Sequence, residues 1–384
     1  MADKSKISWT DRTENFWEGC TKVGPGCDHC YAEDRANRWQ SVIWGAGQPR
    51  RRTAPANRRK PLTWNERHFV ECMACGHRCE LRECAEVDGR SVGGFYPPAE
   101  GKVRLCPNCE EPQLKETRQR VFCSSLSDWL DNEVPAAWRI EMLWTIWKTP
   151  ALDWMLLTKR IGNFRRLIEE VIALVTEGSP EIPPGVQAEE EQLAEWLRAW
   201  LAGQPPANVW IGATIVTPDE AKRDIPKLVD VPAVVRFLSM EPLLAEVNLA
   251  PWLFRCCGNH VVGAEYMGQQ ERLCCGDLEV DPHVDWVIVG AESGHAARPL
   301  HVDWIRKIVD QCKRAGVAVH VKQLGHEIMT TGIEQPGEKW PAGTAHDDRG
   351  GGIFWVRLKH VKGGDPAEWP EDLRVQDFPI PREA

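Results

Sequence analysis

Short apolar runs rich in branched and aromatic side chains recur along the chain, between longer segments whose apolar residues have helical spacing. Such runs are typical of strands buried on both faces of a sheet, and their alternation with helices indicates parallel βαβ units. A first strand is expected at Ile7–Thr10 or just after it. Six further strands are expected at Val121–Ser124, Trp154–Leu157, Val209–Ala213, Val234–Leu238, Trp286–Val289 and Val317–Val321.

The segments that separate these runs are long enough to form helices. Thr217 is a suitable cap for the start of one helix, and Gly316 is suited to end another. The expected helices are Arg139–Thr149, Phe164–Thr176, Glu190–Leu201, Pro218–Leu228 and Asp303–Ala315. The pattern therefore predicts an α/β fold with about seven βα units, a partial or complete (β/α) barrel, in which chemistry takes place at the C-terminal ends of the strands.

Polar or charged residues follow each of the six later strands. Any one of them is explained equally well as a helix cap or a surface loop residue, but packing alone does not explain the whole set. We therefore expect a functional site at this edge of the sheet. The residues concerned are Ser124, Ser125, Asp128, Thr158, Lys159, Arg160, Thr214, Ser239, Glu241, Glu292, Ser293, Lys322 and Gln323.

Three cysteines near the N-terminus, Cys20, Cys27 and Cys30, have the spacing C-x6-C-x2-C. The intervening Gly24-Pro25-Gly26 predicts a turn that lets the backbone wrap closely around a bulky group. Three thiolates can hold a [4Fe-4S] cluster and leave one iron open to a small molecule, whereas four close every iron. A zinc knuckle and a disulfide remain alternatives. A helix expected to start at Tyr31 directs its positive amide end back towards this loop.

Two cysteine-rich insertions interrupt the βα pattern. The first, residues 71–112, contains two CxxC pairs, and the zinc-ribbon spacing predicts a zinc site made of Cys72, Cys75, Cys106 and Cys109. Cys79, Cys84 and His77 lie between these pairs and leave the choice of ligands open. The second insertion, residues 256–281, offers a possible second zinc site, although adjacent cysteines are awkward ligands for one ion. Its cysteines are Cys256, Cys257, Cys274 and Cys275.

Composition narrows the class of protein. The 384-residue chain has no run of 18 apolar residues, so no membrane span is expected, and its first residues lack the apolar core of a signal peptide. Fifteen cysteines in such a chain indicate metals and reduced thiols in the cytoplasm. The net charge of -9 argues against a broadly basic nucleic-acid surface. The one basic run, Arg50–Lys60, is either a phosphate contact or a solvated connector.

The expected domain organisation follows from these patterns. The chain is expected to begin with a first βα unit that contains the three-cysteine loop and the basic run. The first insertion, the barrel core, the second insertion and the rest of the core follow in that order. The last segment is a tail rich in Pro, Gly and charge, and we expect it to be poorly structured. The boundaries are 1–70, 71–112, 113–255, 256–281, 282–330 and 331–384.

The three-cysteine loop resembles the cluster-binding loop of radical S-adenosylmethionine (radical SAM) enzymes, although their usual spacing is C-x3-C-x2-C and the first gap here is longer. The chain as a whole is more similar to a phage-associated three-cysteine-motif family of that superfamily, whose function is unassigned. The stretches that carry this resemblance are Gly19–Val23, Phe122–Asp128, Asp153–Arg160, Asn208–Thr214, Arg236–Leu244, Asp285–Gly294 and Lys322–Gly325.

The resemblance implies that Cys20, Cys27 and Cys30 bind a [4Fe-4S] cluster and that its open iron binds S-adenosyl-L-methionine. An electron from a flavodoxin- or ferredoxin-like reductant would then cleave the cofactor to methionine and a 5'-deoxyadenosyl radical, which removes hydrogen from a substrate. The substrate is expected to be a nucleic-acid component or nucleotide. This chain lacks the Gly-Gly-Glu that usually binds the cofactor's amino end.

The strand-end residues take the remaining roles in this interpretation. Lys159 and Arg160 are candidates to pair with the methionine carboxylate or a substrate phosphate, and Glu241 and Glu292 to bind the ribose hydroxyls or the amino group. The expected cofactor-binding residues are Ser124, Ser125, Asp128, Arg160, Glu292 and Ser293, and the expected catalytic residues are Glu241, Lys159 and Gln323. Two alternatives stay open: a non-catalytic, zinc-stabilised nucleic-acid-binding protein, and a cluster with a redox or structural role only.

Overall fold

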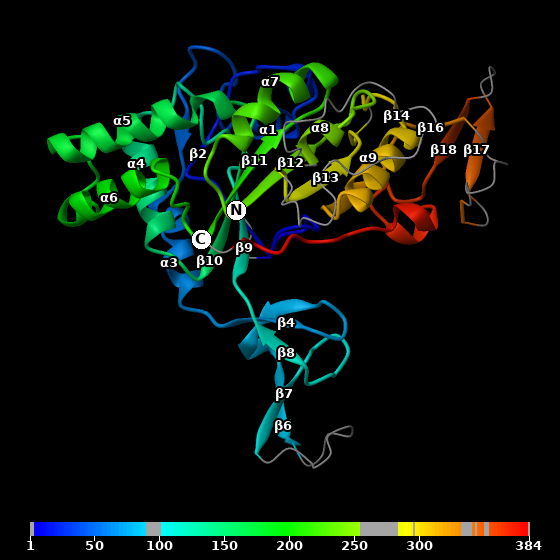
Figure 1. The fold of residues 1–384 in the computed structure, drawn as a ribbon, viewed down its shortest axis with the longest axis horizontal. Helices are drawn as coiled ribbons and strands as arrows, with labels where there is room; N and C mark the ends of the chain where they lie inside the picture. Colours follow the sequence, from blue (N-terminus) through cyan, green and yellow to red (C-terminus); the bar gives the residue numbers. More distant parts are fainter. Residues whose placement is uncertain are drawn as a thin grey trace, which may run out of the picture.

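The computed structural model describes residues 4–89, 101–253, 283–294, 296–331, 340–341, 344–348 and 353–382. A parallel seven-stranded sheet forms its centre (Figure 1), with neighbouring strands in sequence order. This is the arrangement of a (β/α) barrel, and because β1 and β15 remain edges, the barrel is partial. The strands are β1 (Arg12–Glu14), β9 (Gln119–Cys123), β10 (Leu152–Thr158), β11 (Val209–Thr214), β12 (Val235–Met240), β13 (Trp286–Gly290) and β15 (Ala318–Gln323). The mixed α/β architecture and the seven predicted strands are confirmed.

Helices cover the outer face of this sheet, and all five predicted helices are present. The Thr217 side chain accepts a hydrogen bond from the Glu220 amide at 3.3 Å and caps α7. Apolar residues from the helices pack on the outward side chains of the strands in one large core. The helices are α4 (Ala136–Trp147), α5 (Phe164–Glu177), α6 (Glu190–Leu201), α7 (Pro218–Val229), the short α8 (Ala250–Leu253) and α9 (Val302–Arg314). None of the described helices is long and apolar enough to cross a bilayer.

Aromatic side chains fill the concave inner face of the sheet. Gly212 on β11 makes this packing possible, because a Cβ atom there would lie 2.3 Å from the Phe237 ring. The cluster combines Trp9, Phe122, Met155, Trp210, Val234, Val235, Phe237, Trp286 and Ile288. We call this cluster the aromatic floor. Because it fills the middle of the inner face, the polar side chains of that face lie at the carboxyl ends of the strands.

The described part of the C-terminal region packs against the core, unlike the poorly structured tail that its composition suggested. Trp369 and Leu373 are fully buried. The Val321 amide on β15 donates to the Val375 carbonyl at 2.8 Å, so this segment covers the edge of the sheet. A four-stranded sheet precedes it, made of β14 (Leu300–His301), β16 (Ile328–Thr330), β18 (Phe354–Arg357) and β17 (Ala345–Asp348).

The first predicted insertion forms a separate module that projects from the barrel (Figure 1). It contains two small antiparallel sheets. One consists of β5 (Arg78–Glu80), β4 (Phe69–Cys72) and β8 (Leu114–Glu116), and the other of β6 (Ala85–Asp88) and β7 (Lys102–Leu105). The second predicted insertion, with Cys256, Cys257, Cys274 and Cys275, lies outside the described residues.

Candidate functional site

The three-cysteine loop lies across the carboxyl ends of the parallel strands. It follows β2 (Trp17–Glu18), which pairs with β3 (Arg51–Arg52), and it runs directly into α1 (Tyr31–Trp39). Its glycine turn is close to α7, because Cβ atoms added at Gly24 and Gly26 would lie 2.6 Å from Glu220 Oε1 and 3.0 Å from Val216. The predicted turn and helix start are confirmed, and the two glycines let the turn lie close to these side chains.

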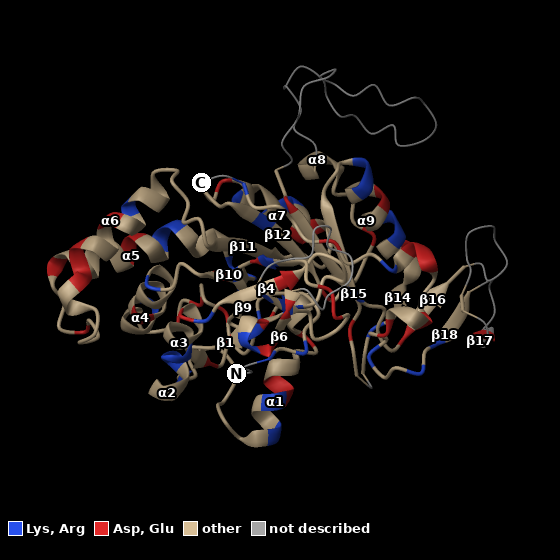
Figure 2. Ribbon diagram, turned by 90° about the horizontal axis from the view of Figure 1, so that it is seen from below, with Lys and Arg blue, Asp and Glu red and all other residues tan. Residues whose placement is uncertain are grey.

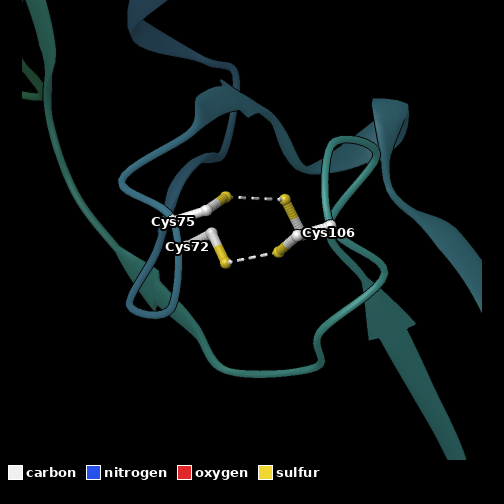
Figure 3. A group of neighbouring side chains, drawn as sticks. Cys72, Cys75 and Cys106 are labelled. Atoms are coloured by element: carbon white, nitrogen blue, oxygen red, sulfur yellow. Dashed lines mark hydrogen bonds between the residues drawn. The ribbon is translucent and has the colours of Figure 1, made fainter.

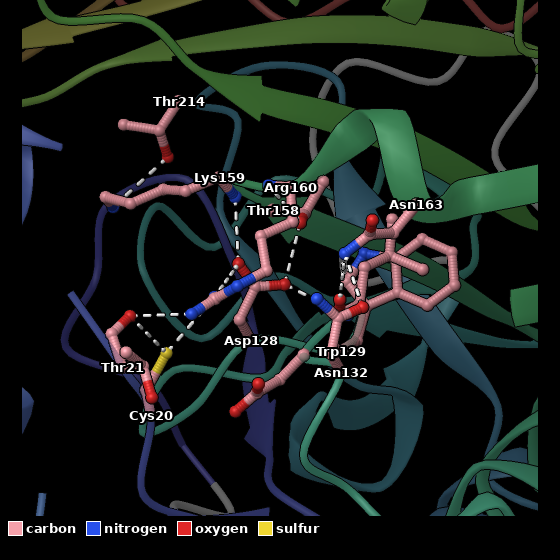
Figure 4. Close-up of polar contacts among 12 residues, drawn as sticks. Cys20, Thr21, Asp128, Trp129, Asn132, Thr158, Lys159, Arg160, Asn163 and Thr214 are labelled. Atoms are coloured by element: carbon pink, nitrogen blue, oxygen red, sulfur yellow. Dashed lines mark hydrogen bonds and ion pairs between the residues drawn. The ribbon is translucent and has the colours of Figure 1, made fainter. Parts of the chain in front are cut away.

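An ion pair between Arg160 and Asp128 fixes the first end of the loop (Figure 4). The Arg160 guanidinium donates to Asp128 Oδ2 at 2.9 Å, to Cys20 Sγ at 3.3 Å and to the Thr21 carbonyl at 2.6 Å. Burial raises the pKa of the Cys20 thiol to about 12, and the Asp128 carboxylate adds to this effect while Arg160 opposes it. The free thiol is therefore protonated at neutral pH, and a metal would have to displace the proton.

Asp128 is in turn held by groups at the end of β10. It accepts hydrogen bonds from the Thr158 hydroxyl at 2.7 Å and from the Lys159 amide at 2.9 Å. The Lys159 side chain points the other way, and its Nζ lies 3.3 Å from Thr214 Oγ1 (Figure 4). Asp128 and Arg160 thus position the loop, while Lys159 remains available at the carboxyl edge.

A second ion pair fixes the other end of the loop. Arg298 forms a bidentate pair with Glu292 after β13, with distances of 2.7 and 3.1 Å, and reaches Asp28 at 3.0 Å. His29 Nδ1 lies 2.9 Å from Glu292 Oε2. Burial alone would raise the pKa of Glu292, but the hydrogen bonds from Arg298 outweigh it and hold this pKa below its usual value. Glu292 therefore anchors the residues between Cys27 and Cys30.

The remaining strand-end residues divide into two groups. Glu241 pairs with Lys322 at 2.9 Å on the inner face, above the aromatic floor. Gln323 instead donates to the Ala291 carbonyl at 2.8 Å and joins two strand ends. Ser124 is buried, and Ser293 is partly buried. The Ser125 carbonyl accepts a hydrogen bond from the Tyr31 hydroxyl, which ties α1 to the sheet edge.

Four cysteines in the projecting module gather into one group suited to a metal ion (Figure 3). Cys72 and Cys109 have their sulfurs 3.6 Å apart, and Cys75 and Cys106 have theirs 3.7 Å apart. All four ligand atoms lie within 4.8 Å of one another, and no other set of three or more ligand side chains among the described residues meets this limit. The three sulfurs of the loop are thus spread more widely than those of the module.

The structure settles which cysteines of the first insertion come together. Cys79 and Cys84 lie 3.6 Å apart in a small apolar cluster of their own and stand outside the four-cysteine group. His77 is likewise not part of that group. Cys123 and Cys312 are buried in the barrel core.

Most arginines of the basic run Arg50–Lys60 form ion pairs within the fold, and a contact with phosphates stays a prediction. Arg50 is buried against Asp131 at 2.7 Å, and Arg58 pairs with Glu141 at 2.8 Å. Arg52 also reaches Glu141. These pairs join the run to the barrel, and they leave few of its charges for phosphates.

Comparison with known proteins places the chain in a family but assigns no activity. The family described as "Protein of unknown function (DUF5131)" matches residues 4–350. The chain belongs to this family. No curated protein and no solved structure shows a significant match to it.

Two anchors of this DUF5131 chain escaped sequence analysis. Arg298 follows β13 in an irregular loop, and nothing in its spacing marks it as the partner of Glu292. Arg50 appeared as part of a charged run, whereas its side chain is fully buried and also donates to Thr21 at 2.8 Å. Their acidic partners, Asp131 and Glu292, are visible in the sequence. Only the arrangement of the strands shows that these carboxylates lie next to the two arginines.

Proposed function

We propose that the chain is a radical S-adenosylmethionine enzyme whose [4Fe-4S] cluster is held by Cys20, Cys27 and Cys30. The observation that carries the proposal is a loop of three thiols anchored across the carboxyl edge of a partial (β/α) barrel. The three sulfurs do not gather within 4.8 Å of one another as those of the module do, and a cluster, whose ligands bind different irons, does not require so close an approach. A single zinc ion with Zn–S bonds of about 2.3 Å would require sulfurs about 3.8 Å apart.

The donor set also fits an open iron. The other described cysteines are in the projecting module or buried in the barrel core, so the loop supplies three thiols. When bound, the cluster would supply the electron that cleaves S-adenosyl-L-methionine into methionine and a 5'-deoxyadenosyl radical. A flavodoxin- or ferredoxin-like protein is the proposed electron donor.

The residues of this chain take revised roles in this proposal. Arg160 and Glu292 are engaged by the loop and act as positioning residues rather than ligands of the cofactor. Lys159 is a cation at the carboxyl edge that could pair with the methionine carboxylate, since among the described residues its Nζ has a hydrogen bond to the Thr214 hydroxyl at 3.3 Å and no acidic partner. Glu241, paired with Lys322 at 2.9 Å, is the candidate to accept hydrogen bonds from the ribose or the amino group.

We further propose that the four-cysteine group binds zinc with a structural role. Its sulfur separations of 3.6 and 3.7 Å match the roughly 3.8 Å expected around a tetrahedral zinc ion. Four thiolates close the coordination sphere, so no position remains for a substrate. The module lies away from the three-cysteine loop (Figure 1), which supports separate roles for the two metals.

The test uses protein purified without oxygen and reconstituted with iron and sulfide. Its absorption and EPR spectra are recorded, and 5'-deoxyadenosine is measured after adding dithionite and S-adenosyl-L-methionine. The Cys20/Cys27/Cys30→Ala variant should lose both the cluster and the product. The matched control, Cys72→Ser/Cys106→Ser, should lose zinc but keep the cluster signal. A colourless protein that binds only zinc and forms no 5'-deoxyadenosine would refute the proposal and favour a metal-stabilised binding module.

A further inference from the structure

Helix α1, which begins next to the third cysteine of the loop, is unusually exposed. Only Ala32 and Ala36 are buried, and the other contacts of the helix with the body are polar, among them the hydrogen bond from the Tyr31 hydroxyl to the Ser125 carbonyl. Figure 2 shows it projecting at one side of the molecule. Eight large apolar side chains of the described residues are exposed, and four of them lie between residues 23 and 43. These are Val23, Tyr31, Trp39 and Ile43.

Aromatic and guanidinium side chains share one flank of α1. Tyr31, Arg35 and Trp39 recur every fourth residue, and Arg38 lies beside them, so helical geometry places the four in one row, called here the α1 stripe. Glu33 lies on the far flank of the helix by the same geometry, whereas Asp34 is one turn before Arg38 and borders the stripe. The two arginines still leave this flank with a net positive charge. The stripe is therefore locally basic, although the chain as a whole is acidic.

The charges and rings of the α1 stripe are weakly engaged within the protein. No acidic group pairs with Arg38 in the part of the chain that the structure describes. Arg35 has one distant pair, with Glu18 at 3.7 Å, and Glu18 already bonds to Arg51 at 2.5 Å. Trp39 is 71% exposed, and no ring or cation among the described residues stacks on it.

We propose that the α1 stripe binds single-stranded nucleic acid, which would make a nucleic-acid strand the substrate class of the adjacent three-cysteine site. Exposed aromatic rings that stack on bases, interleaved with cations that contact phosphates, are the common features of such surfaces. A protein partner fits less well, because stable protein interfaces need a continuous, well-packed apolar core. Here charged side chains separate the rings.

The position of the α1 stripe connects it to the proposed chemistry. Tyr31 directly follows Cys30, and its hydroxyl bonds to the Ser125 carbonyl at the edge of the sheet. From Tyr31 to Trp39 the helix rises about 12 Å, a length that a few nucleotides span. A strand that stacks on Trp39 therefore passes the three-cysteine loop. This assignment of a substrate class rests on the proposed function, whereas binding by the stripe does not.

The test measures fluorescence anisotropy of labelled oligo(dT) and oligo(rU) with the reconstituted protein, without reductant or S-adenosyl-L-methionine. Trp39→Ala should weaken binding about 5- to 150-fold, the range for loss of one base stack, and Trp39→Phe should retain part of the affinity. Arg35→Ala/Arg38→Ala should reduce the magnitude of the salt-dependence slope by about 1.4, because each phosphate contact on a single strand contributes about 0.7. Asn37→Ala, on the other flank, is the matched control and should bind like the unmodified protein.

The outcomes separate this proposal from the function proposed above. Binding with the expected variant pattern in a protein that forms no cluster would support the stripe and refute the radical chemistry. A protein that makes 5'-deoxyadenosine but binds neither oligonucleotide at low salt would overturn the stripe alone. Equal affinity in all variants would also overturn it. A third result would also overturn it: Trp39→Ala abolishes the binding of an acidic flavodoxin but leaves oligonucleotide binding unchanged. The stripe would then dock the electron donor.

Discussion

Replacing Arg160 with methionine tests whether the three-cysteine loop is anchored by a buried ion pair. The Arg160 and Asp128 side chains are 8% and 6% exposed. Removing the guanidinium leaves the Asp128 carboxylate buried without its cation, a change that typically costs about 3–5 kcal/mol of folding free energy. Asp128 keeps its hydrogen bonds from the Thr158 hydroxyl and the Lys159 amide, so we expect about 3 kcal/mol, the lower end of this range.

The measurement is urea denaturation followed by tryptophan fluorescence. Arg160→Lys is the control, because a lysine keeps a charge beside Asp128 but cannot also donate to Cys20 and Thr21 in the same fork. It should recover part of the stability. A loss below about 1 kcal/mol in Arg160→Met would refute the reasoning, since exposed ion pairs have that value.

The same two variants give a second, independent measurement. Hydrogen bonds to cluster sulfurs are among the factors that set the reduction potential. The donor from Arg160 to Cys20 should stabilise the reduced, more negative cluster, so both variants should shift its potential to lower values in an EPR-monitored titration. An unchanged potential together with a large loss of stability would show that Arg160 anchors the loop without influencing the cluster.

Three further predictions follow from single residues. Burial raises the pKa of Glu14 from 4.5 to about 8, so the folded protein holds this proton more tightly than the unfolded chain does. Stability should therefore fall as pH rises from about 5 to about 8, and Glu14→Gln should flatten this dependence in urea titrations; an identical slope would contradict it. Glu292→Gln breaks the pair with Arg298 and should lower the affinity for cluster iron about 10- to 100-fold, measured as iron per chain at limiting iron, with zinc content as the unchanged control. Gly212→Ala places a Cβ 2.3 Å from Phe237 and should cost about 1–3 kcal/mol in thermal denaturation, an expectation that an unchanged melting temperature would rule out.

The strands of the barrel could be predicted from sequence because their side chains are buried on both faces. The run at Trp286–Val289, for example, contains no polar residue. The observed strand β13 matches this predicted run and is one residue longer. The packed C-terminal segment could not be predicted. Trp369 and Leu373 are isolated apolar residues among Pro, Gly and charged residues, so no periodic pattern reveals that both are fully buried.

The location of the site could be predicted, but not the partners within it. Parallel strands bring their carboxyl ends to one edge, so residues after each strand had to meet there. Which charges pair depends on side-chain reach across loops. Arg160 and Glu292 were expected to bind the cofactor, and the structure engages both with the loop instead. Residue type and strand position therefore identified the carboxyl edge of the sheet as the candidate site. The structure was needed to show which of its side chains hold the loop and which remain available for a ligand.

The two cysteine sets differ in how they are supported, and this difference predicts how the protein responds to a chelator. The loop is held by ion pairs to the strand ends of the barrel, and the module is joined to the barrel by the pairs of Glu80 with Arg12 and of Arg78 with Asp11. Among its described residues, the module has a small buried cluster of Val70, Cys79 and Cys84, against which Leu81 and Leu114 pack. We expect so small a core to offset little of the entropy of ordering the surrounding chain, and the proposed zinc ion would contribute to stability, by about 10–16 kcal/mol for structural zinc.

Removal of metal should therefore unfold the module and leave the barrel intact. Hydrogen exchange measured before and after treatment with a zinc chelator should show loss of protection in β4, β5 and β8, with protection in β10 and β11 unchanged. Cys72→Ser should reproduce the pattern without a chelator, because three thiolates bind zinc more weakly than four. Protection that survives complete zinc loss would mean that the small core of the module is sufficient. Joint loss of protection in both parts would mean instead that the barrel depends on the module, which their separate cores argue against.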